Sequence, residues 1–252
     1  MTKTRPVFKP AVDPEFPWRL TLRNFTWQAY PYRTSIAGWN ALLSRARAGD
    51  PEAEWSVAAY YEDGCKDRKG KILVRRSVRK SIAWLRRAAK HGSVSAQNNL
   101  GVALGSGTLT AKDIPAAVAW LRSASDGGDA AAALNLAITY RENKNLKMAV
   151  KWFRRAADSG DDEALIQLGI HYYWGKGVRK DAAAAVRFFR KATKGKNLSG
   201  CGRDDAFFCL GLAYFEGKGV KQSIRTAAKL LRRANVDDDN PAASKLLSQL
   251  GN

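Results

Sequence analysis

The chain has 252 residues and carries 43 Lys and Arg against 23 Asp and Glu, which gives a formal net charge of +20. Its hydrophobic content of 45% is sufficient at this length to bury a core and excludes a disordered chain. No stretch reaches the roughly 18 apolar residues of a membrane span, and three cysteines without a visible export signal indicate a reducing compartment. We therefore expect a cytoplasmic protein with no disulfide framework and no membrane segment.

Residues 1–35 are predicted to form an extended arm. Five prolines forbid a long helix in this segment: Pro6, Pro10, Pro14, Pro17 and Pro31. The stretch 18–23 alternates apolar and polar side chains, as a short strand or extended segment does. Two roles stay open for this Pro-rich N-terminal arm, namely packing on the rest of the chain or contacting a partner.

Residues 36–48 predict a lone capping helix, since Trp39, Leu42 and Ala46 lie on one helical stripe. At the other end of the chain, residues 241–250 predict a second lone helix. Single helices at both ends are typical of repeat proteins, because a terminal unit needs one face that tolerates water.

Between these caps, a pattern with a basic period of about 36 residues recurs five times. Counted from its first residue as zero, it has Ala at 0, Leu at 4, Gly at 5, Tyr at 8, Gly at 11 and 13, Ala at 21, an aromatic residue at 24 and Ala at 28. Positions 0, 4 and 8 share one helical stripe and positions 21, 24 and 28 share another, so each copy predicts a pair of helices. The copies begin at Ala53, Ala96, Ala132, Ala164 and Ala206. The predicted repeats span residues 53–92, 96–128, 132–160, 164–202 and 206–238.

The small residues at positions 5 and 28 allow the two helices of a repeat to approach closely. We expect the large aromatic side chain at position 24 to fill the space between them. The Gly-Lys-Gly-Val turn, present at 175–178, ends the first helix because Gly readily adopts a positive φ. The third repeat lacks this turn, and the first repeat has a basic insertion in its place.

The motif Ala-x3-Leu-Gly-x2-Tyr-x2-Gly-x-Gly-Val, matched best at 164–178 and 206–220, resembles that of the Sel-1-like repeat family, relatives of the tetratricopeptide (TPR) repeats. The resemblance implies an all-α fold, a right-handed α/α superhelical solenoid of about five helix pairs with capping helices. It also implies a function in binding, because members mostly act as adaptors in protein complexes and some bacterial ones are immunity proteins against secreted toxins.

Residues suited to catalysis or metal binding are few and scattered. His91 and His171 lie in different repeats, with no Cys or carboxylate at metal-ligand spacing, so a structural role is expected for both. Cys209, within a predicted helix, and Cys201, in an insertion, are interpreted as free thiols. The Ser-x-x-Lys match at 77–80 has none of the companion motifs of an acyl-transfer enzyme. We expect no catalytic site, no cofactor and no metal.

In the related TPR geometry, the first helix of each pair lines the concave surface. By that analogy, positions 2, 6, 9 and 10 of each repeat face the groove, and they become apolar and aromatic toward the C-terminal half of the chain. Three explanations stay open: packing inside a tightly wound superhelix, an exposed patch for a protein partner, and a homodimer interface. The candidate partner-binding residues are Trp55, Asn98, Leu134, Ile138, Arg141, Ile166, Ile170, Tyr173, Trp174, Phe208, Leu212 and Phe215.

The densest basic block is the insertion of the first repeat. Its cations are Lys66, Arg68, Lys69, Lys71, Arg75, Arg76, Arg79 and Lys80. A field of this sign attracts an acidic partner and accelerates its encounter with the protein. Nucleic acid is a less favoured partner, because phosphate binding needs basic residues along one continuous groove and these are spread over loops and second helices.

We therefore predict a non-enzymatic protein–protein interaction module, monomeric or homodimeric, that binds an acidic protein through its concave surface. The specific form that we favour is a bacterial immunity protein that neutralises a secreted toxin or effector. The alternatives are an adaptor or regulatory scaffold in a protein complex and, from another class, a basic nucleic-acid-binding protein.

Overall fold

The computed structural model describes residues 35–67, 69–195, 198, 200–235 and 240–250. The arm expected over residues 1–35 therefore lies, apart from Ser35, outside the described residues.

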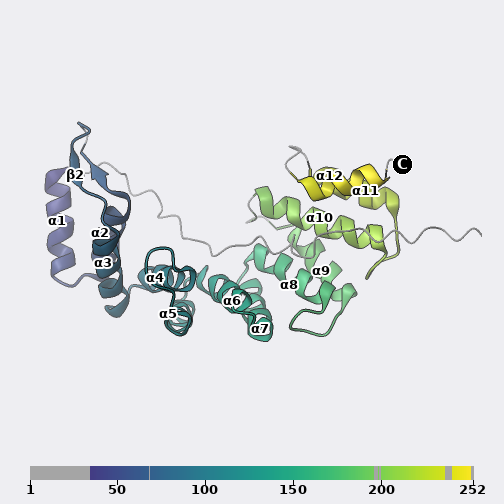
Figure 1. Cartoon of the computed structure of the whole chain (residues 1–252), viewed down its shortest axis with the longest axis horizontal. Helices are drawn as coiled ribbons and strands as arrows, with labels where there is room; N and C mark the ends of the chain where they lie inside the picture. Colours follow the sequence, from purple (N-terminus) through teal and green to yellow (C-terminus); the bar gives the residue numbers. More distant parts are fainter. Residues whose placement is uncertain (1–34, 68, 196–197, 199, 236–239, 251–252) are drawn as a thin grey trace, which may run out of the picture. The chain divides into compact units, whose positions relative to one another are not determined.

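Helices arranged in consecutive pairs make up most of the described chain (Figure 1). The pairs α2–α3, α4–α5, α6–α7, α8–α9 and α10–α11 each pack together closely, and this confirms the predicted all-α solenoid of five helix-pair repeats. Helices α1 and α12 stand outside the pairs, one at each end. The elements are α1 (Ile36–Arg47), α2 (Pro51–Asp63), β1 (Cys65–Lys66), β2 (Ile72–Val74), α3 (Val78–Lys90), α4 (Val94–Ser106), α5 (Ile114–Asp126), α6 (Ala132–Glu142), α7 (Leu146–Asp158), α8 (Asp162–Trp174), α9 (Ala182–Ala192), α10 (Gly200–Glu216), α11 (Ile224–Arg233) and α12 (Pro241–Leu250).

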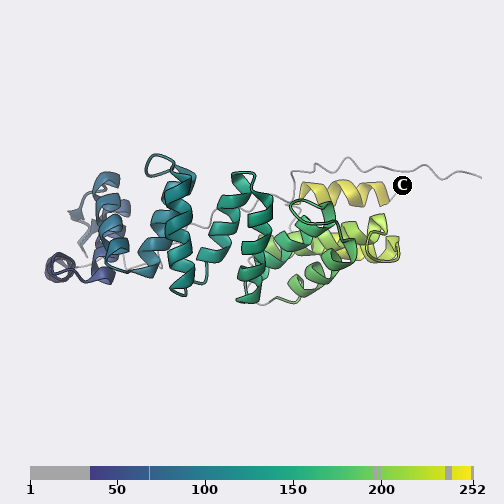
Figure 2. The ribbon, with the colours of Figure 1, turned by 90° about the horizontal axis from the view of Figure 1, so that it is seen from below.

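The described residues fall into two compact units. Helices α1–α7 and the two strands form the N-terminal unit, which ends at Ser159, and helices α8–α12 form the C-terminal unit, which begins at Gly160. In Figure 2 the successive helices of the N-terminal unit stack side by side.

Most helices begin where a short polar side chain caps the first turn. Asp161 Oδ1 accepts a hydrogen bond from the backbone N–H of Ala164 at 2.9 Å, and Asp181 does the same for Ala184 at 2.8 Å. Such a bond satisfies one of the backbone donors that a helix start leaves without a partner. The capping residues are Ser35, Asp50, Ser77, Ser93, Asp113, Asn145, Asp161, Asp181 and Ser223.

The two helices of a repeat meet where position 5 of the first faces position 25 of the second. A Cβ atom added to Gly101 would lie 2.6 Å from Cγ of Leu121, and one added to Gly211 would lie 3.0 Å from Cγ of Leu231. Glycine is therefore required at these two positions because the second helix approaches so closely, and not because the backbone adopts a positive φ. Position 25 is almost fully buried in every repeat, where it holds Leu85, Leu121, Phe153, Phe189 and Leu231.

Our expectation that position 24 fills this space is wrong for most repeats. Trp84, Trp120 and Phe188 at that position are only half-buried, and Trp152 is the buried exception. Positions 24 and 25 both lie on the side of the second helix that faces the first helix. The side chain at position 25 points more directly at the glycine at position 5.

Candidate protein-binding surfaces

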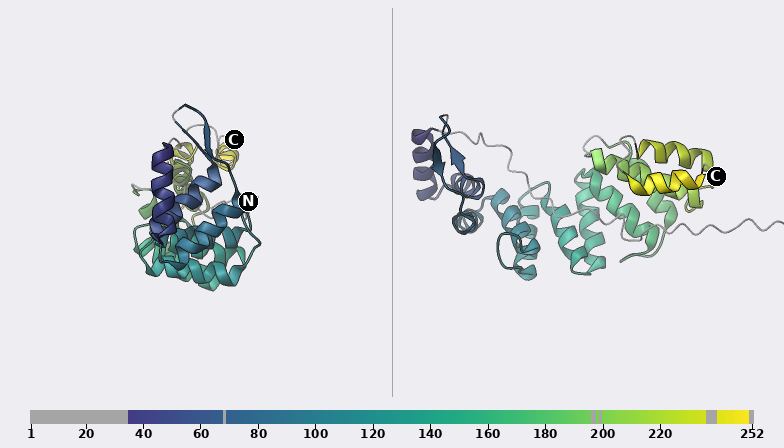
Figure 3. Two further views of the ribbon diagram at one scale, coloured as in Figure 1. Left: turned by 90° about the vertical axis from the view of Figure 1, so that its left-hand side faces the viewer. Right: turned by 45° about the horizontal axis from the view of Figure 1, so that its top comes forward.

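The basic insertion of the first repeat forms a β-hairpin rather than an irregular loop. Strand β1 pairs antiparallel with β2, with Cys65 opposite Val74 and Lys66 opposite Ile72, and a bulge interrupts the register between these pairs. In Figures 1 and 3 the hairpin projects beyond the ends of helices α1–α3. A two-stranded ribbon of this length is marginal alone, so its order must come from its surroundings.

The turn of the hairpin is held by Asp67. Its Oδ1 accepts hydrogen bonds from the backbone N–H groups of Lys69 at 2.9 Å and Lys71 at 2.8 Å, and its own N–H donates to the Lys71 carbonyl at 2.8 Å. Gly70, with φ of +84°, supplies the left-handed residue that the turn requires. Asp67 and, three residues later, Gly70 are thus the sequence signal of this turn.

The base of the hairpin is anchored in the N-terminal unit. Cys65 and Val74 are buried with Tyr60, and Trp39 and Leu42 of α1 pack against the same cluster. Backbone and side-chain hydrogen bonds add to this packing, and the protruding segment is therefore fixed at its root.

Two bonds connect the end of β2 to the end of α2. The backbone N–H of Ser77 donates to the Tyr61 carbonyl at 2.7 Å, and Nε of Arg76 donates to the Glu62 carbonyl at 2.9 Å. Helix C-termini leave carbonyls without partners inside the helix, so Arg76 satisfies one of them while its charge remains at the surface.

The predicted basic residues surround this hairpin and face solvent. Arg68 lies outside the described residues, and the other seven are exposed: Lys66, Lys69, Lys71, Arg75, Arg76, Arg79 and Lys80. Lys80 places its ammonium 5.1 Å from the ring centre of Tyr61, a cation–π contact that leaves the charge available. The structure thus brings the sequence-predicted cations together around one short ribbon.

A pocket of about 440 Å³ opens between the end of α2 and the hairpin. Its lining includes the cations Lys66, Arg75 and Arg76, the carboxylate of Asp63 and the aliphatic residue Ile72, with buried Val74 beneath. Ile72 is 56% exposed, which is unusual for a large apolar side chain in this protein. Ile72 is not among the predicted binding residues, and an apolar residue within a run of cations is the sequence signal that could have indicated it.

Of the twelve candidate residues on the first helices, nine are buried. The side chains of these nine residues pack inside the protein, and their role in contacting a partner stays a prediction. The nine are Trp55, Asn98, Leu134, Ile138, Ile166, Ile170, Tyr173, Phe208 and Leu212. The polar group of Asn98 is also used internally, because its Oδ1 accepts a hydrogen bond from Nδ2 of Asn135 at 3.0 Å. Only Arg141, Trp174 and Phe215 keep substantial exposed surface.

In the C-terminal unit, Trp174 belongs to a cluster built by α8 and α10. The hydroxyl of buried Tyr173 donates a hydrogen bond to Glu216, and burial together with this bond raises the pKa of Tyr173 far above its ordinary value. The Lys218 ammonium lies 2.9 Å from Oε2 of Glu216 and 5.6 Å from the ring centres of both Tyr173 and Trp174. The cluster is therefore charge-compensated, and Trp174 and Phe215 provide its accessible aromatic surface.

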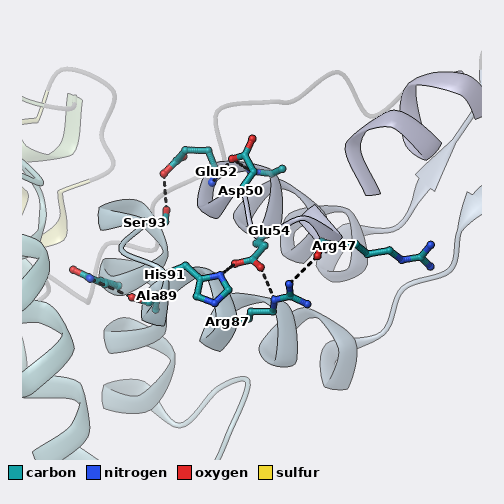
Figure 4. A network of polar contacts seen from close by, with 10 residues as sticks. Arg47, Asp50, Glu52, Glu54, Arg87, Ala89, His91 and Ser93 are labelled. Atoms are coloured by element: carbon teal, nitrogen blue, oxygen red, sulfur yellow. Dashed lines mark hydrogen bonds and ion pairs between the residues drawn. The ribbon is translucent and has the colours of Figure 1, made fainter. Parts of the chain in front are cut away.

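A second polar network lies in the N-terminal unit (Figure 4). The fully buried carboxylate of Glu54 has Arg87 Nε at 2.5 Å and His91 Nδ1 at 2.8 Å. Arg87 also donates to the Arg47 carbonyl at 3.2 Å, so the network joins the end of α1 to α2 and α3. His91, for which a structural role was expected, is the C-cap residue of α3 and contacts buried Glu54, a partner that the sequence did not indicate. The Arg87 guanidinium supplies a positive charge that compensates the buried carboxylate.

The model of the Sel1 repeat matches residues 51–93, 94–129, 130–161, 162–197 and 208–235, more than half of the chain. The chain belongs to the Sel1 repeat family. Sel1 and TPR repeat proteins are generally scaffolds for protein interactions. Among curated proteins, no sequence is significantly similar to this chain.

Solved structures share this Sel1 architecture. A protective antigen of uropathogenic Escherichia coli with an SLR fold is 27% identical with a TM-score of 0.70, and the match covers 84% of this chain and 44% of that one. A Sel1 repeat protein from Oxalobacter formigenes is 24% identical with a TM-score of 0.63, covering 86% and 89% of the two chains. YrrB, a TPR protein with an unusual peptide-binding site, is 16% identical with a TM-score of 0.53, covering 83% and 99%. This chain thus spans less than half of the Escherichia coli protein, and the latter two likenesses show the fold alone.

The remaining histidine and cysteine residues considered for catalysis or metal binding lie in the helices of the Sel1 repeats. His171 is buried, and its Nδ1 lies 2.6 Å from the Lys176 carbonyl oxygen, so this nitrogen carries the proton and holds the Gly-Lys-Gly-Val turn. Burial, with a smaller effect of Asp205, raises the pKa of the Cys209 thiol well above its ordinary value, which disfavours the reactive thiolate. Cys201 lies in the first turn of α10, within the segment 198–207 that separates the fourth and fifth matched repeats.

Two negative findings apply to the described part of the chain. Within it, no three His, Cys, Asp or Glu side chains are grouped so as to hold a metal ion. None of the helices described there combines the length and apolar character needed to cross a membrane.

Proposed function

We propose that this Sel1 repeat protein is a non-enzymatic interaction module that binds an acidic protein partner. The observation that carries the proposal is the group of seven exposed cations on and next to the hairpin of the first repeat, whose root packs against Tyr60, Trp39 and Leu42. Together with the net charge of +20, this arrangement attracts an acidic surface and accelerates association.

A second contact region is proposed for the surface of the first helices. Since most of the candidate residues there are buried, the direct contacts are assigned to Arg141, Trp174 and Phe215. Half-buried aromatic side chains on ordered helices are typical anchors of protein interfaces, because they add contact area at a small cost in conformational entropy. Burial lowers the pKa of Arg141, with an opposing effect of Glu142, and a partner's carboxylate would relieve that penalty.

The specific form that we propose is a bacterial immunity protein in the cytoplasm that neutralises a secreted toxin or effector. Blocking a toxin requires a large complementary surface and stoichiometric binding, and it requires no catalytic group. Buried free thiols at Cys65 and Cys209 suit a reducing compartment. The proposal draws on family resemblance for the immunity role and on the charge distribution for the acidic partner.

An adaptor role is the second candidate. It is favoured by one observation, that the basic hairpin lies in the N-terminal unit and the Trp174 cluster lies in the C-terminal unit. Two chemically different surfaces on separate units suit a scaffold that holds two partners.

The test is capture of partners by the full chain, followed by reconstitution with each purified acidic candidate. An immunity role predicts a one-to-one complex, measured by calorimetry, that abolishes the toxicity of the partner in cells. An adaptor role predicts a non-toxic partner or a ternary complex. If no acidic protein binds at physiological salt while random DNA or RNA is retarded in a gel, the proposal is overturned in favour of nucleic-acid binding.

A further inference from the structure

We infer that the pocket at the root of the hairpin receives a short acidic segment of the partner, with one apolar side chain seated between flanking carboxylates. This inference rests on the proposed function and goes further, because it names the place of contact and the chemistry of the ligand.

The walls of the pocket determine what fits. Ile72 offers an exposed aliphatic side chain, and Lys66, Arg75 and Arg76 border it with positive charge that outweighs the single carboxylate of Asp63 in the lining. An apolar side chain gains free energy by covering Ile72, which is exposed to 56%. Carboxylates beside it meet guanidinium groups, which bind them with two parallel hydrogen bonds.

The size of the pocket limits the ligand to a few residues. Its volume of about 440 Å³ lies near the lower end of the roughly 300–1,000 Å³ typical of ligand pockets. This volume accommodates one or two side chains of an extended segment. Recognition of short acidic motifs by arginine clusters is a recurring mode of peptide binding.

The pocket is largely preformed, which favours binding because little ordering is needed. Arg76 is held by the Glu62 carbonyl at 2.9 Å, and Asp67 closes the turn of the hairpin through Lys69 and Lys71. Cys65 and Val74 fix the two strands to the core of the N-terminal unit.

Net charge disfavours two occupants that this protein could supply. Residues 1–34 contain six Lys and Arg against two Asp and Glu, so this segment carries the same sign as the pocket. A second copy carries a net charge of +20, which opposes its approach even though its sequence contains an acidic run at 237–239. We therefore assign the pocket to an acidic segment of a different protein.

The hairpin is also unlike a site for single-stranded nucleic acid. Single-stranded nucleic acid binds on aromatic side chains that stack with its bases, and residues 64–77 contain no aromatic residue. The exposed aliphatic side chain of Ile72 has no function toward a phosphate backbone.

The test uses the full chain and two fluorescein-labelled ten-residue peptides, measured by fluorescence anisotropy at about 150 mM salt, where weak surface attraction is screened. The first peptide has a single leucine flanked on both sides by aspartates and glutamates, and in the second the leucine is replaced by serine. We expect saturable binding of the leucine peptide and at least about fivefold weaker binding of the serine peptide, because only leucine covers the aliphatic wall.

Three variants locate the site. The double variant Lys66→Glu, Arg75→Glu is expected to weaken binding of the leucine peptide by about tenfold or more. The matched control Arg187→Glu, Lys191→Glu makes the same change of net charge on exposed residues of α9 and should stay within about twofold of wild type. Ile72→Ser is expected to abolish the discrimination between the two peptides, and circular dichroism verifies that each variant is folded.

Each other outcome overturns the inference. Equal affinity for the two peptides, or equal losses in both double variants, would mean attraction by net charge alone. Absence of saturable binding below about 1 mM, corresponding to about 4 kcal/mol, would remove the pocket as a site. Tighter binding of a ten-nucleotide single-stranded DNA than of the leucine peptide would identify a nucleic-acid surface instead.

A hairpin replacement separates this inference from the proposed function. The turn between Gly175 and Asp181 of the fourth repeat occupies the place that the hairpin takes between Gly64 and Ser77. Substituting residues 65–76 by the sequence of 176–180 therefore removes the pocket and keeps the repeat. If the reconstituted acidic protein binds this variant with unchanged affinity, the inference fails together with the assignment of the hairpin as the contact, while binding of an acidic partner through another surface stands. If the wild type binds no acidic protein, the proposed function as a whole fails.

Discussion

The carboxylate of Glu54 lies 2.8 Å from Nδ1 of His91, although the two residues belong to different helices of the first repeat. Its other oxygen lies 2.5 Å from Nε of Arg87. Glu54 is fully buried, whereas the side chains of Arg87 and His91 remain about 40% exposed. A buried carboxylate depends strongly on such partners, because it has lost its hydration.

The first prediction concerns this ion pair. Arg87→Met removes the main counter-charge and keeps the apolar stem, and we expect the free energy of unfolding to fall by about 2–3 kcal/mol. Chemical denaturation measures the change. The control Arg86→Met alters an exposed neighbour on the same helix and should have an effect below about 0.5 kcal/mol. Equal effects of both substitutions would show that Glu54 does not need Arg87.

The second prediction concerns the closest approach within the fourth repeat, where Gly169 faces the ring of Phe189 with no room for a Cβ atom. Gly169→Ala should destabilise the protein by about 1–2 kcal/mol, because overpacking outweighs the gain in helix propensity. The third repeat provides a matched position, since Ala137 stands in place of the glycine opposite Phe153. Thermal unfolding of Ala137→Gly should show a loss of about 1 kcal/mol from propensity, and a higher melting temperature for Gly169→Ala would contradict the interpretation.

The third prediction follows from the opposite pKa shifts of two carboxyl groups. Burial raises the pKa of Asp129, against the hydrogen bonds that it accepts from Ala131 and Ala132. Hydrogen bonding from the Ala53 N–H, and then Arg45, lowers the pKa of Asp50. A raised folded-state pKa means that Asp129 favours the folded state below the ordinary pKa of 3.8, and that this contribution is lost as pH rises through the folded-state value.

Asparagine variants of Asp129 and Asp50 distinguish the raised pKa from the lowered one. Because the amide oxygen still accepts the backbone hydrogen bonds, Asp129→Asn should gain stability relative to wild type as pH rises from 3 to 7. Asp50→Asn should show the reverse, with a loss at pH 7 that diminishes as pH falls below 3.8 through the folded-state pKa. Denaturant unfolding at several pH values measures both differences, and parallel pH profiles for the two variants would refute the assignment.

The fourth prediction tests the aromatic surface of the C-terminal unit. Trp174→Ala should weaken partner binding by about 2 kcal/mol, as anchors of interfaces do, while helicity measured by circular dichroism is retained. Phe215→Ala should act in the same direction. Trp120→Ala, at a half-buried position on a second helix, serves as the control and should leave the partner affinity unchanged. Loss of helicity in both Trp174→Ala and Phe215→Ala would place these residues in the core.

The fifth prediction is kinetic. The double variant Lys69→Glu, Arg79→Glu replaces exposed cations that do not line the pocket, and it should reduce the association rate with an acidic protein by about tenfold at low salt and change the dissociation rate much less. The difference should largely disappear at about 1 M salt, where the Debye length is about 3 Å. Surface plasmon resonance distinguishes the two rates, and a loss confined to the dissociation rate would point to direct contacts rather than steering.

Repeats and helix boundaries were predictable from the sequence because the information is local. Alanine, leucine and glycine at fixed spacing mark the two helical stripes, and residues such as Asp161 and Asp181 mark helix starts through their own hydrogen bonds. The free thiol of Cys209 and the structural setting of His171 also follow from patterns within a single helix and its turn.

Other features depend on residues that are distant in the chain. The partner helix decides that the side chain at position 25, and not the one at position 24, fills the space between the helices, as Gly169 and Phe189 illustrate. The hairpin was missed because strands as short as Ile72–Val74 have no periodicity to detect and become ordered by packing against Tyr60 and its neighbours.

Spacing along this chain thus suffices to define five helix pairs, their caps and an excess of positive charge. Burial of residues such as Ile138 and Phe208, by contrast, is set by how closely neighbouring helices approach. That approach depends on the summed shapes of side chains from several repeats, so no single segment encodes which apolar residues remain accessible to a partner.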